Sequence, residues 1–143
     1  MEYFIGKVKQ LDPDLIVCHG MTTGIFEVLI NRLSILKIAH WSWLGRFKRT
    51  QVPRGGSFGG FWLARQVTVG RLICDTFTSA KELIRETNYN LTELSRTQLQ
   101  TKWEEFDLTM LVNFYKSWGA DLLKVVNHTE RDAFFTMELM MKL

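Results

Sequence analysis

Two short apolar runs interrupt an otherwise mixed pattern of hydrophobic and polar positions. Leu15–Cys18 follows a turn at Asp12–Asp14, and Leu72–Cys74 ends at Asp75. A continuous apolar run of this length, bounded by turn residues, is typical of a strand buried on both faces of a sheet. We therefore expect two central strands in an α/β fold, a class of fold that places its chemistry at the C-terminal ends of its strands.

Apolar residues at helical spacing occupy much of the remaining chain. Glu2–Gln10 and Phe26–Ile38 each carry an apolar stripe, and Asp107–Leu143 is an almost unbroken helical pattern. Such stripes are typical of helices that pack one face against a core. The last stretch is long enough for two or three helices, with a break near Gly119 or Asn127.

Two shorter helices are expected between these stretches. Ser79 and Glu82 have the spacing of a capping box, which predicts a helix over residues 79–87. A second short helix begins at Asn90 or Thr92 and ends near residue 100. The pattern as a whole predicts few strands and several helices.

Residues 50–70 have the composition of an exposed hairpin. Pro53 and several glycines mark a loop, and Phe61–Ala64 and Gln66–Val69 are candidate strand pieces on its flank. The run Arg54–Gly60 lacks the Gly-Lys-Ser/Thr ending of a phosphate-binding P-loop. We therefore expect a hairpin insert over residues 50–70 with a glycine-rich tip.

Composition narrows the class of protein. The chain has 143 residues, enough for one domain or part of one, and 46% of them are hydrophobic, as in ordinary globular proteins. It contains no apolar run of the roughly 20 residues that a membrane span needs, and no signal-peptide layout at its N-terminus, so neither a membrane partner nor secretion is expected. Cys18 and Cys74 each lie in a strand-like run and are expected to be buried, reduced thiols.

The formal net charge of +3 hides a strong segregation of charge along the chain. No Asp or Glu occurs between Val28 and Cys74, and this acid-free window carries +8, against −5 for the rest of the chain. Such asymmetry favours an anionic partner such as nucleic acid, although a solvated basic face without a ligand is the alternative. The residues predicted to contact DNA are Arg46, Lys48, Arg49, Arg54 and Arg65.

Aromatic residues interleave with these basic residues. Exposed rings can stack on bases while cations follow the phosphates, so the combination is typical of single-stranded nucleic-acid sites. Burial in the core is the competing interpretation, and we expect it for Trp41 and Trp62. The aromatic residues of the window are Trp41, Trp43, Phe47, Phe58, Phe61 and Trp62.

The stretch Leu11–Leu29 resembles the second exonuclease motif of the family B DNA polymerases. In proofreading members this motif reads roughly I-x-G-Y-N-x-x-x-F-D-x-x-x-L, and its aspartate helps to hold the catalytic metals. In this sequence Gly20 stands at the Asn position, Gly24 at the Phe position and Ile25 at the Asp position. A third family motif, Tyr-x-x-x-Asp, aligns with His128 and Asp132.

Further segments extend the resemblance over most of the chain. These segments are similar to segments of the alpha-type replicative polymerases of eukaryotes, and they occur in the same order. Several short motifs in the right order are far more specific than one isolated pattern. The segments are Asp12–Val17, His40–Ser42, Gly45–Arg49, Gly70–Asp75, Ser79–Arg85, Tyr89–Leu94, His128–Thr129 and Arg131–Ala133.

The resemblance implies a partial ribonuclease H-like, 3′–5′ exonuclease-like fold. The family fold has a five-stranded mixed sheet, and its first three strands carry an Asp-x-Glu motif that would precede this sequence. Residues 1–143 are therefore expected to be the C-terminal portion of an exonuclease-like domain and a fragment of a larger polymerase. Because a two-metal nuclease needs several converging carboxylates, the degenerate positions Gly20, Ile25, His128 and Asp132 predict an inactivated exonuclease without a metal.

The same resemblance implies the role of the parent protein. It would be a DNA-directed DNA polymerase, a nucleotidyltransferase that extends RNA–DNA primers on a DNA template in the nucleus. Its Mg²⁺ ions would belong to a separate palm domain, and its partners would include primase and accessory subunits. This segment would serve as a scaffold and contact DNA.

Two other functions remain open on the residues alone. The acid-free window by itself fits a stand-alone nucleic-acid-binding or protein-interaction module. An exonuclease with unusual ligands would have to use Glu27 or His128. However, Glu27 lies in the first turn of an expected helix, where the helix dipole already favours a carboxylate. His128 and Asp132 are four residues apart, which also fits a local contact on one helix face.

Overall fold

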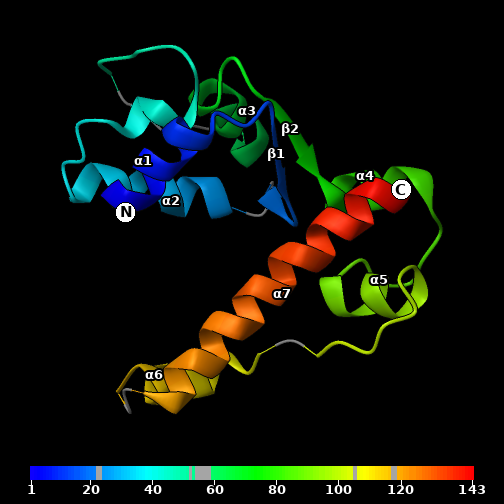
Figure 1. Ribbon diagram of the computed structural model, residues 1–143. Helices are drawn as coiled ribbons and strands as arrows, with labels where there is room; N and C mark the ends of the chain where they lie inside the picture. The colour runs from blue at the N-terminus through cyan, green and yellow to red at the C-terminus, as the bar shows by residue number, and fades with distance from the viewer. Residues whose placement is uncertain (22–23, 52, 54–58, 105, 117–118) are drawn as a thin grey trace. The chain divides into compact units, whose positions relative to one another are not determined.

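The computed structural model describes residues 1–21, 24–51, 53, 59–104, 106–116 and 119–143 (Figure 1). The α/β class expected from the sequence is confirmed, because the described part contains seven α-helices, a short 3-10 helix and a two-stranded sheet. The chain divides into two compact units, Met1–Asp75 and Thr76–Leu143. Each unit is described by itself below.

The first unit contains the sheet. Strands β1 (Leu15–Cys18) and β2 (Leu72–Asp75) run parallel, with Leu15 opposite Leu72 and Cys18 opposite Asp75. Both strands form where the sequence predicts them. Among the eight paired residues only Asp75 is fully buried, so the prediction of strands buried on both faces is wrong for the described sheet.

Helices α1 (Glu2–Leu11) and α2 (Ile25–Ile35) and the 3-10 helix η2 (Trp41–Leu44) surround the core of this unit. The helical stripes predicted near residues 2–10 and 26–38 are confirmed, because their apolar positions supply the core. Trp41 is buried, as expected. The core residues are Ile5, Ile30, Leu33, Ile38, Trp41, Leu44, Leu63 and Val67.

Helix α3 (Gly59–Val67) replaces the predicted strand pieces, which are therefore wrong. Leu63, Ala64 and Val67 are buried at helical spacing, so one face of the segment packs while the other faces outward. The β-branched run that suggested a strand begins only at the end of the helix. Residues 52 and 54–58 of the predicted hairpin insert lie outside the described residues, as does the predicted DNA contact Arg54.

The second unit consists of helices. They are α4 (Thr76–Leu83), α5 (Leu91–Thr97), α6 (Leu108–Lys116) and α7 (Ala120–Lys142). Its core contains Ala80, Leu91, Leu94, Phe135 and Leu139.

The caps of these helices test three predictions. Asn90 is the N-cap of α5, and its side chain accepts a hydrogen bond from the N–H of Glu93, as the sequence indicated. Ser79 lies inside α4, so the predicted capping box is wrong; the helix begins directly after β2 instead. Gly119, with φ of 106°, precedes α7, which continues unbroken past Asn127.

Cys18 and Cys74 are free thiols, as expected, but both are half-buried and not buried as predicted. The Cys18 thiol donates to the carbonyl oxygen of Cys74 across the sheet, at 3.7 Å. Burial, followed by the charge of Asp75 and the neighbouring Cys74, raises the pKa of the Cys18 thiol to about 12.

Among the described residues, no helix combines the length and the apolar character that crossing a membrane requires.

Candidate functional site

The first two degenerate positions follow β1, where the predicted motif would aim an aspartate at metal ions. The N–H of Gly20 donates to the Oδ1 atom of Asp75 at 2.8 Å in a buried hydrogen bond. Gly24 precedes α2 with φ of 101°, a conformation that side chains rarely adopt. Ile25 is the first residue of α2 and 51% exposed. The motif position that would hold a metal therefore presents a hydrocarbon side chain.

The other two positions, His128 and Asp132, lie one turn apart on α7 in the second unit. Their side chains meet, with His128 Nε2 3.6 Å from Asp132 Oδ2. The His128 ring also stacks on Trp103 with ring centres 4.3 Å apart, and the edge of Phe106 approaches it at 4.7 Å. The local contact considered from the sequence is thus part of an aromatic cluster.

The carboxylate of Asp132 is already used by this cluster. Its Oδ1 atom accepts a hydrogen bond from the indole N–H of Trp103 at 2.7 Å, while Oδ2 faces His128. Within the described ranges, no group of three or more His, Cys, Asp or Glu side chains could hold a metal ion. The residues described here therefore do not fit the two-metal centre of a nuclease.

Glu27, the substitute ligand considered from the sequence, occupies the first turn of α2 and is exposed. A shallow hollow beside it is lined by Gly24, Ile25, Val28 and Asn31, none of which is a carboxylate or histidine. Its position matches the helix-dipole interpretation, since a carboxylate in the first turn faces the positive end of the helix.

Two arginines of the acid-free window form an ion-pair network with the Asp12–Asp14 turn. Arg46 Nε lies 3.0 Å from Asp12 Oδ1, and its Nη2 atom reaches Asp14. Arg71 Nη1 lies 2.7 Å from the same Asp12 oxygen, and only 2% of its side chain is exposed. The hydrogen bonds from Arg46 and then Arg71 hold the pKa of Asp12 below its ordinary value.

Sequence reasoning missed this network. Asp12 and Arg71 are far apart in the chain, and they meet because each lies just before one of two paired parallel strands. The sequence does place Arg71 directly before a predicted strand. Its pairing with Asp12 could not be predicted, because it depends on which strand lies alongside and in which register. The predicted contact between Arg46 and DNA stays a prediction. The Arg46 side chain already pairs with the carboxylates of Asp12 and Asp14.

Other residues predicted from the sequence gather on the outward face of α3. The Nη1 atom of Arg49 donates to both the carbonyl oxygen and the Oε1 atom of Gln66, at 2.9 and 3.0 Å. Arg65 lies over the ring of Phe61, with 5.8 Å between the guanidinium carbon and the ring centre. Phe61 and Trp62 are exposed, so the expected burial of Trp62 is wrong. We call Arg49, Phe61, Trp62, Arg65 and Gln66 the α3 face.

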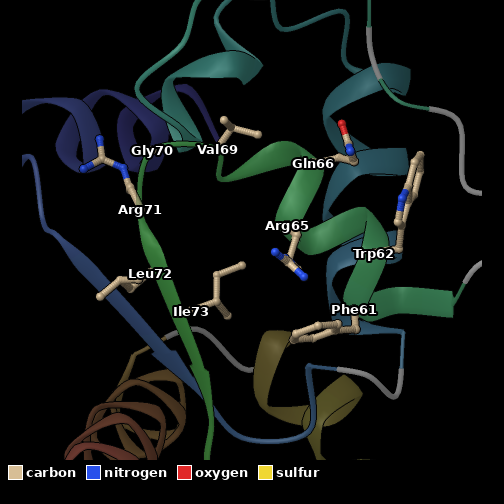
Figure 2. Close-up of a pocket in the computed structure, with 9 residues that line it drawn as sticks. All are labelled: Phe61, Trp62, Arg65, Gln66, Val69, Gly70, Arg71, Leu72 and Ile73. Carbon is tan, nitrogen blue, oxygen red and sulfur yellow. The ribbon is translucent and has the colours of Figure 1, made fainter.

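The α3 face borders a cavity of about 550 Å³, of the size that ligand pockets usually have. Figure 2 shows Arg65 and Ile73 facing each other across the space between α3 and β2, with Phe61 at one end of that space. Lys48 lies elsewhere, beside a second hollow lined by Lys9, Trp43 and Phe47. Arg65 thus lies with Phe61 and Trp62 at this cavity, whereas Arg49 is held at α3 by its hydrogen bonds to Gln66. Arg46 donates to the carbonyl oxygen of Gly70, which also lines the cavity.

Comparison with known proteins identifies the family of this chain. Residues 1–94 match the family model described as DNA polymerase family B, exonuclease domain. The chain therefore belongs to the family B DNA polymerases, and its matched part to their exonuclease domain.

The curated relatives narrow the family further. The chain is 48% identical to the DNA polymerase alpha catalytic subunit of Sterkiella nova, over 98% of this chain and 10% of that protein. It is 38% identical to the protein of the same name from Mus musculus, over 99% and 10%, and 32% identical to that from Arabidopsis thaliana, over 96% and 9%. The similarity to alpha-type polymerases is confirmed, and the chain spans about a tenth of the length of these relatives.

Proposed function

We propose that this chain is an exonuclease-like part of an alpha-type DNA polymerase that contacts single-stranded DNA and has no nuclease chemistry. The observation that carries the proposal is the α3 face, where Arg65 lies over Phe61, Arg49 is bonded to Gln66, and Phe61 and Trp62 are exposed. Cations that follow phosphates beside rings that stack on bases are the usual elements of single-strand binding.

The absence of nuclease chemistry is supported by the chemistry of the motif positions. Ile25 offers no metal-binding oxygen, and the Asp132 carboxylate accepts from Trp103. We propose that the two parallel strands belong to a ribonuclease H-like sheet that now serves as a scaffold. The polymerase as a whole would extend RNA–DNA primers on a DNA template in the nucleus, with primase and accessory subunits. Its Mg²⁺ ions would be held in a separate palm domain.

Binding is tested by fluorescence anisotropy of a labelled single strand with the 143-residue chain. The double variant R49E/R65E is expected to bind at least about tenfold more weakly at low salt, because two favourable phosphate contacts become repulsive. Lys102→Glu is the control for a single charge reversal away from the α3 face, since the Lys102 side chain is 88% exposed in the other unit and lies 3.4 Å from Glu104. Equal affinity of the double variant and the wild type would contradict the proposal.

Nuclease activity is tested separately with labelled single-stranded DNA and Mg²⁺ or Mn²⁺. We expect no degradation above background. Turnover that disappears in Asp132→Ala or in Glu27→Gln would instead establish the alternative, an exonuclease with unusual ligands.

The role in a larger polymerase is tested by reading the coding sequence on both sides of this segment. A polymerase predicts an Asp-x-Glu position, intact or degenerate, upstream and a palm motif of the Tyr-x-Asp-Thr-Asp type downstream. A reading frame without them would favour the stand-alone nucleic-acid-binding or protein-interaction module.

A further inference from the structure

The cavity beside the α3 face reaches the edge of β2. Leu72 and Ile73 both line it, although neighbouring residues of a strand point to opposite faces of a sheet. Lining by both residues indicates that the cavity extends around the strand edge. The other edge of β2 pairs with β1, so the cavity lies along the edge that β1 does not cover.

The strand register shows which backbone groups this edge presents. The N–H of Leu72 donates to the carbonyl oxygen of Asp14, so the backbone groups of Leu72 point toward β1. In a parallel pair, alternate residues direct both groups to the same side. The N–H and C=O of Ile73 therefore point away from β1, and they offer one donor and one acceptor side by side at the edge of the cavity.

The remaining groups around the cavity complement a nucleotide. The ring of Phe61 is 47% exposed and can stack on a base, and the guanidinium of Arg65 faces the cavity where a phosphate could be neutralised. The cavity lies in the acid-free window, so no described acidic side chain lines it. This charge balance favours an anionic occupant over a cationic one.

We propose that this cavity binds one unpaired nucleotide of a single strand. The Watson–Crick edge of a base carries neighbouring donor and acceptor atoms, which match the N–H and C=O of Ile73. Phe61 stacks on the base, and Arg65 binds an adjacent phosphate. The Watson–Crick edge and one face of the base must both be free for these contacts. The site therefore selects single-stranded over duplex nucleic acid. The inference rests on the proposed function and adds base recognition to it.

Anisotropy measurements with three oligonucleotides of equal length separate this inference from the proposed function. The probes are a labelled single strand with bases, a single strand of abasic sites with the same charge, and a duplex. We expect the base-bearing strand to bind about tenfold more tightly than the abasic strand. Phe61→Ala should abolish that preference while it leaves the affinity for the abasic strand unchanged. Phe47→Ala is the matched control, because Phe47 is also exposed in the acid-free window but does not line this cavity.

Amide chemical shifts give a second readout that does not depend on a variant. Titration with the base-bearing strand should shift the amide resonance of Ile73, and titration with the abasic strand should not. Equal binding of the base-bearing and abasic strands would overturn the nucleotide site and leave the proposed function standing. Failure of every strand to bind would overturn both. An Ile73 amide that shifts with an extended peptide but not with DNA would identify the edge as a peptide site and would also overturn the inference.

Discussion

At the scale of single residues, the contacts of Asp132 give its carboxylate a structural position. The resemblance predicts that Asp132 stands at the Asp position of the third exonuclease motif, and its oxygens face Trp103 and His128. A carboxylate that accepts an indole N–H in a half-buried site makes a charge-assisted hydrogen bond, one of the stronger kinds in proteins. These contacts explain the carboxylate at this position by packing within the second unit.

We predict that Asp132→Ala lowers the free energy of unfolding by about 1.5–3 kcal/mol, because the Trp103 N–H loses a charged acceptor. Asp132→Asn should recover much of this loss, since its amide oxygen can still accept. Glu130→Ala, an exposed carboxylate on the same helix, serves as the control and should change stability little. Urea denaturation followed by tryptophan fluorescence measures all three, and equal stability of Asp132→Ala and Glu130→Ala would refute the assigned role.

The thiol of Cys18 gives a second prediction at this scale. Because burial raises its folded pKa to about 12, the folded state keeps its proton when the unfolded chain has lost it. The contribution of the Cys18 thiol to the free energy of unfolding is fully present below the ordinary thiol pKa of about 9. It is lost as pH rises from about 9 to about 12. Cys18→Ser should remove this part of the alkaline loss, as measured by denaturation at stepped pH. In Cys74→Ser, alkylation of Cys18 at pH 9 should be at least tenfold slower than in urea.

At the scale of elements, close packing between segments decides which substitutions are tolerated. A Cβ atom on Gly45, directly after η2, would lie 2.8 Å from the carbonyl oxygen of Val69 and 2.9 Å from that of Val67. Those atoms are backbone and cannot move aside at low cost. Gly6 inside α1 has no atom within 4 Å of the corresponding position.

These two glycines predict opposite effects of the same substitution. Gly45→Ala should destabilise the protein by about 1–3 kcal/mol through overpacking. Gly6→Ala should stabilise it by about 0.5–1 kcal/mol, because alanine restricts the unfolded chain and favours the helix. Thermal unfolding of both variants tests the packing of η2 against the turn after α3. Stabilisation by both would show that this turn does not approach Gly45.

The turn between α1 and β1 joins its elements through charge. Asp12 ends α1 in the left-handed region, with φ of 42°, and accepts from Arg46 and Arg71. Because these hydrogen bonds lower its folded pKa, its contribution to stability is present above the ordinary Asp pKa of about 4 and is lost on further acidification.

Asp12→Asn tests this contribution, since asparagine also tolerates the left-handed conformation. The variant should be less stable at pH 7 and should lose less additional stability between pH 5 and pH 2 than the wild type. Glu104→Gln, which removes an exposed carboxylate in the other unit, should leave the acid limb unchanged. Identical acid limbs for Asp12→Asn and the wild type would show that the ion pairs add no stability.

At the scale of the whole molecule, the segregated charge of the sequence is partly neutralised on folding. Arg46 and Arg71 of the acid-free window pair with Asp12 and Asp14, which lie outside it. Fewer cations of the window therefore remain for phosphate contact than the sequence count suggests. The candidates with described positions are Lys48, Arg49 and Arg65.

This reduced count predicts the salt dependence of single-strand binding. With about three phosphate contacts, the plot of log affinity against log salt concentration should have a slope of about −2. Arg65→Gln should reduce the magnitude of the slope by about 0.7, whereas Arg46→Gln should lower stability and leave the slope unchanged. A slope that falls equally in both variants would support the DNA contact predicted for Arg46 from the sequence.

The sequence by itself determined the two strands, most of the helices and the family. These features are local: the apolar run Leu15–Cys18 and the cap at Asn90 depend on neighbours within a few residues. The assignment of Ile25 to the position of the motif aspartate also depends on neighbouring residues, and it stays a prediction. Helix α3 could not be predicted, because the glycine-rich sequence before it and the β-branched residues at its end are typical of a hairpin. The segment is helical because one face of the helix is buried in the core.

Only the tertiary structure decided which charged and aromatic side chains meet. Asp12 reaches Arg71 because the parallel register places the starts of both strands side by side. Likewise, Asp132 reaches Trp103 across 29 positions of the chain, and Arg49 reaches Gln66 on α3. Local periodicity carries no information about such pairs, because they depend on which distant segments pack together. For this reason the family could be predicted from the sequence, while the α3 face could be recognised only in the folded chain.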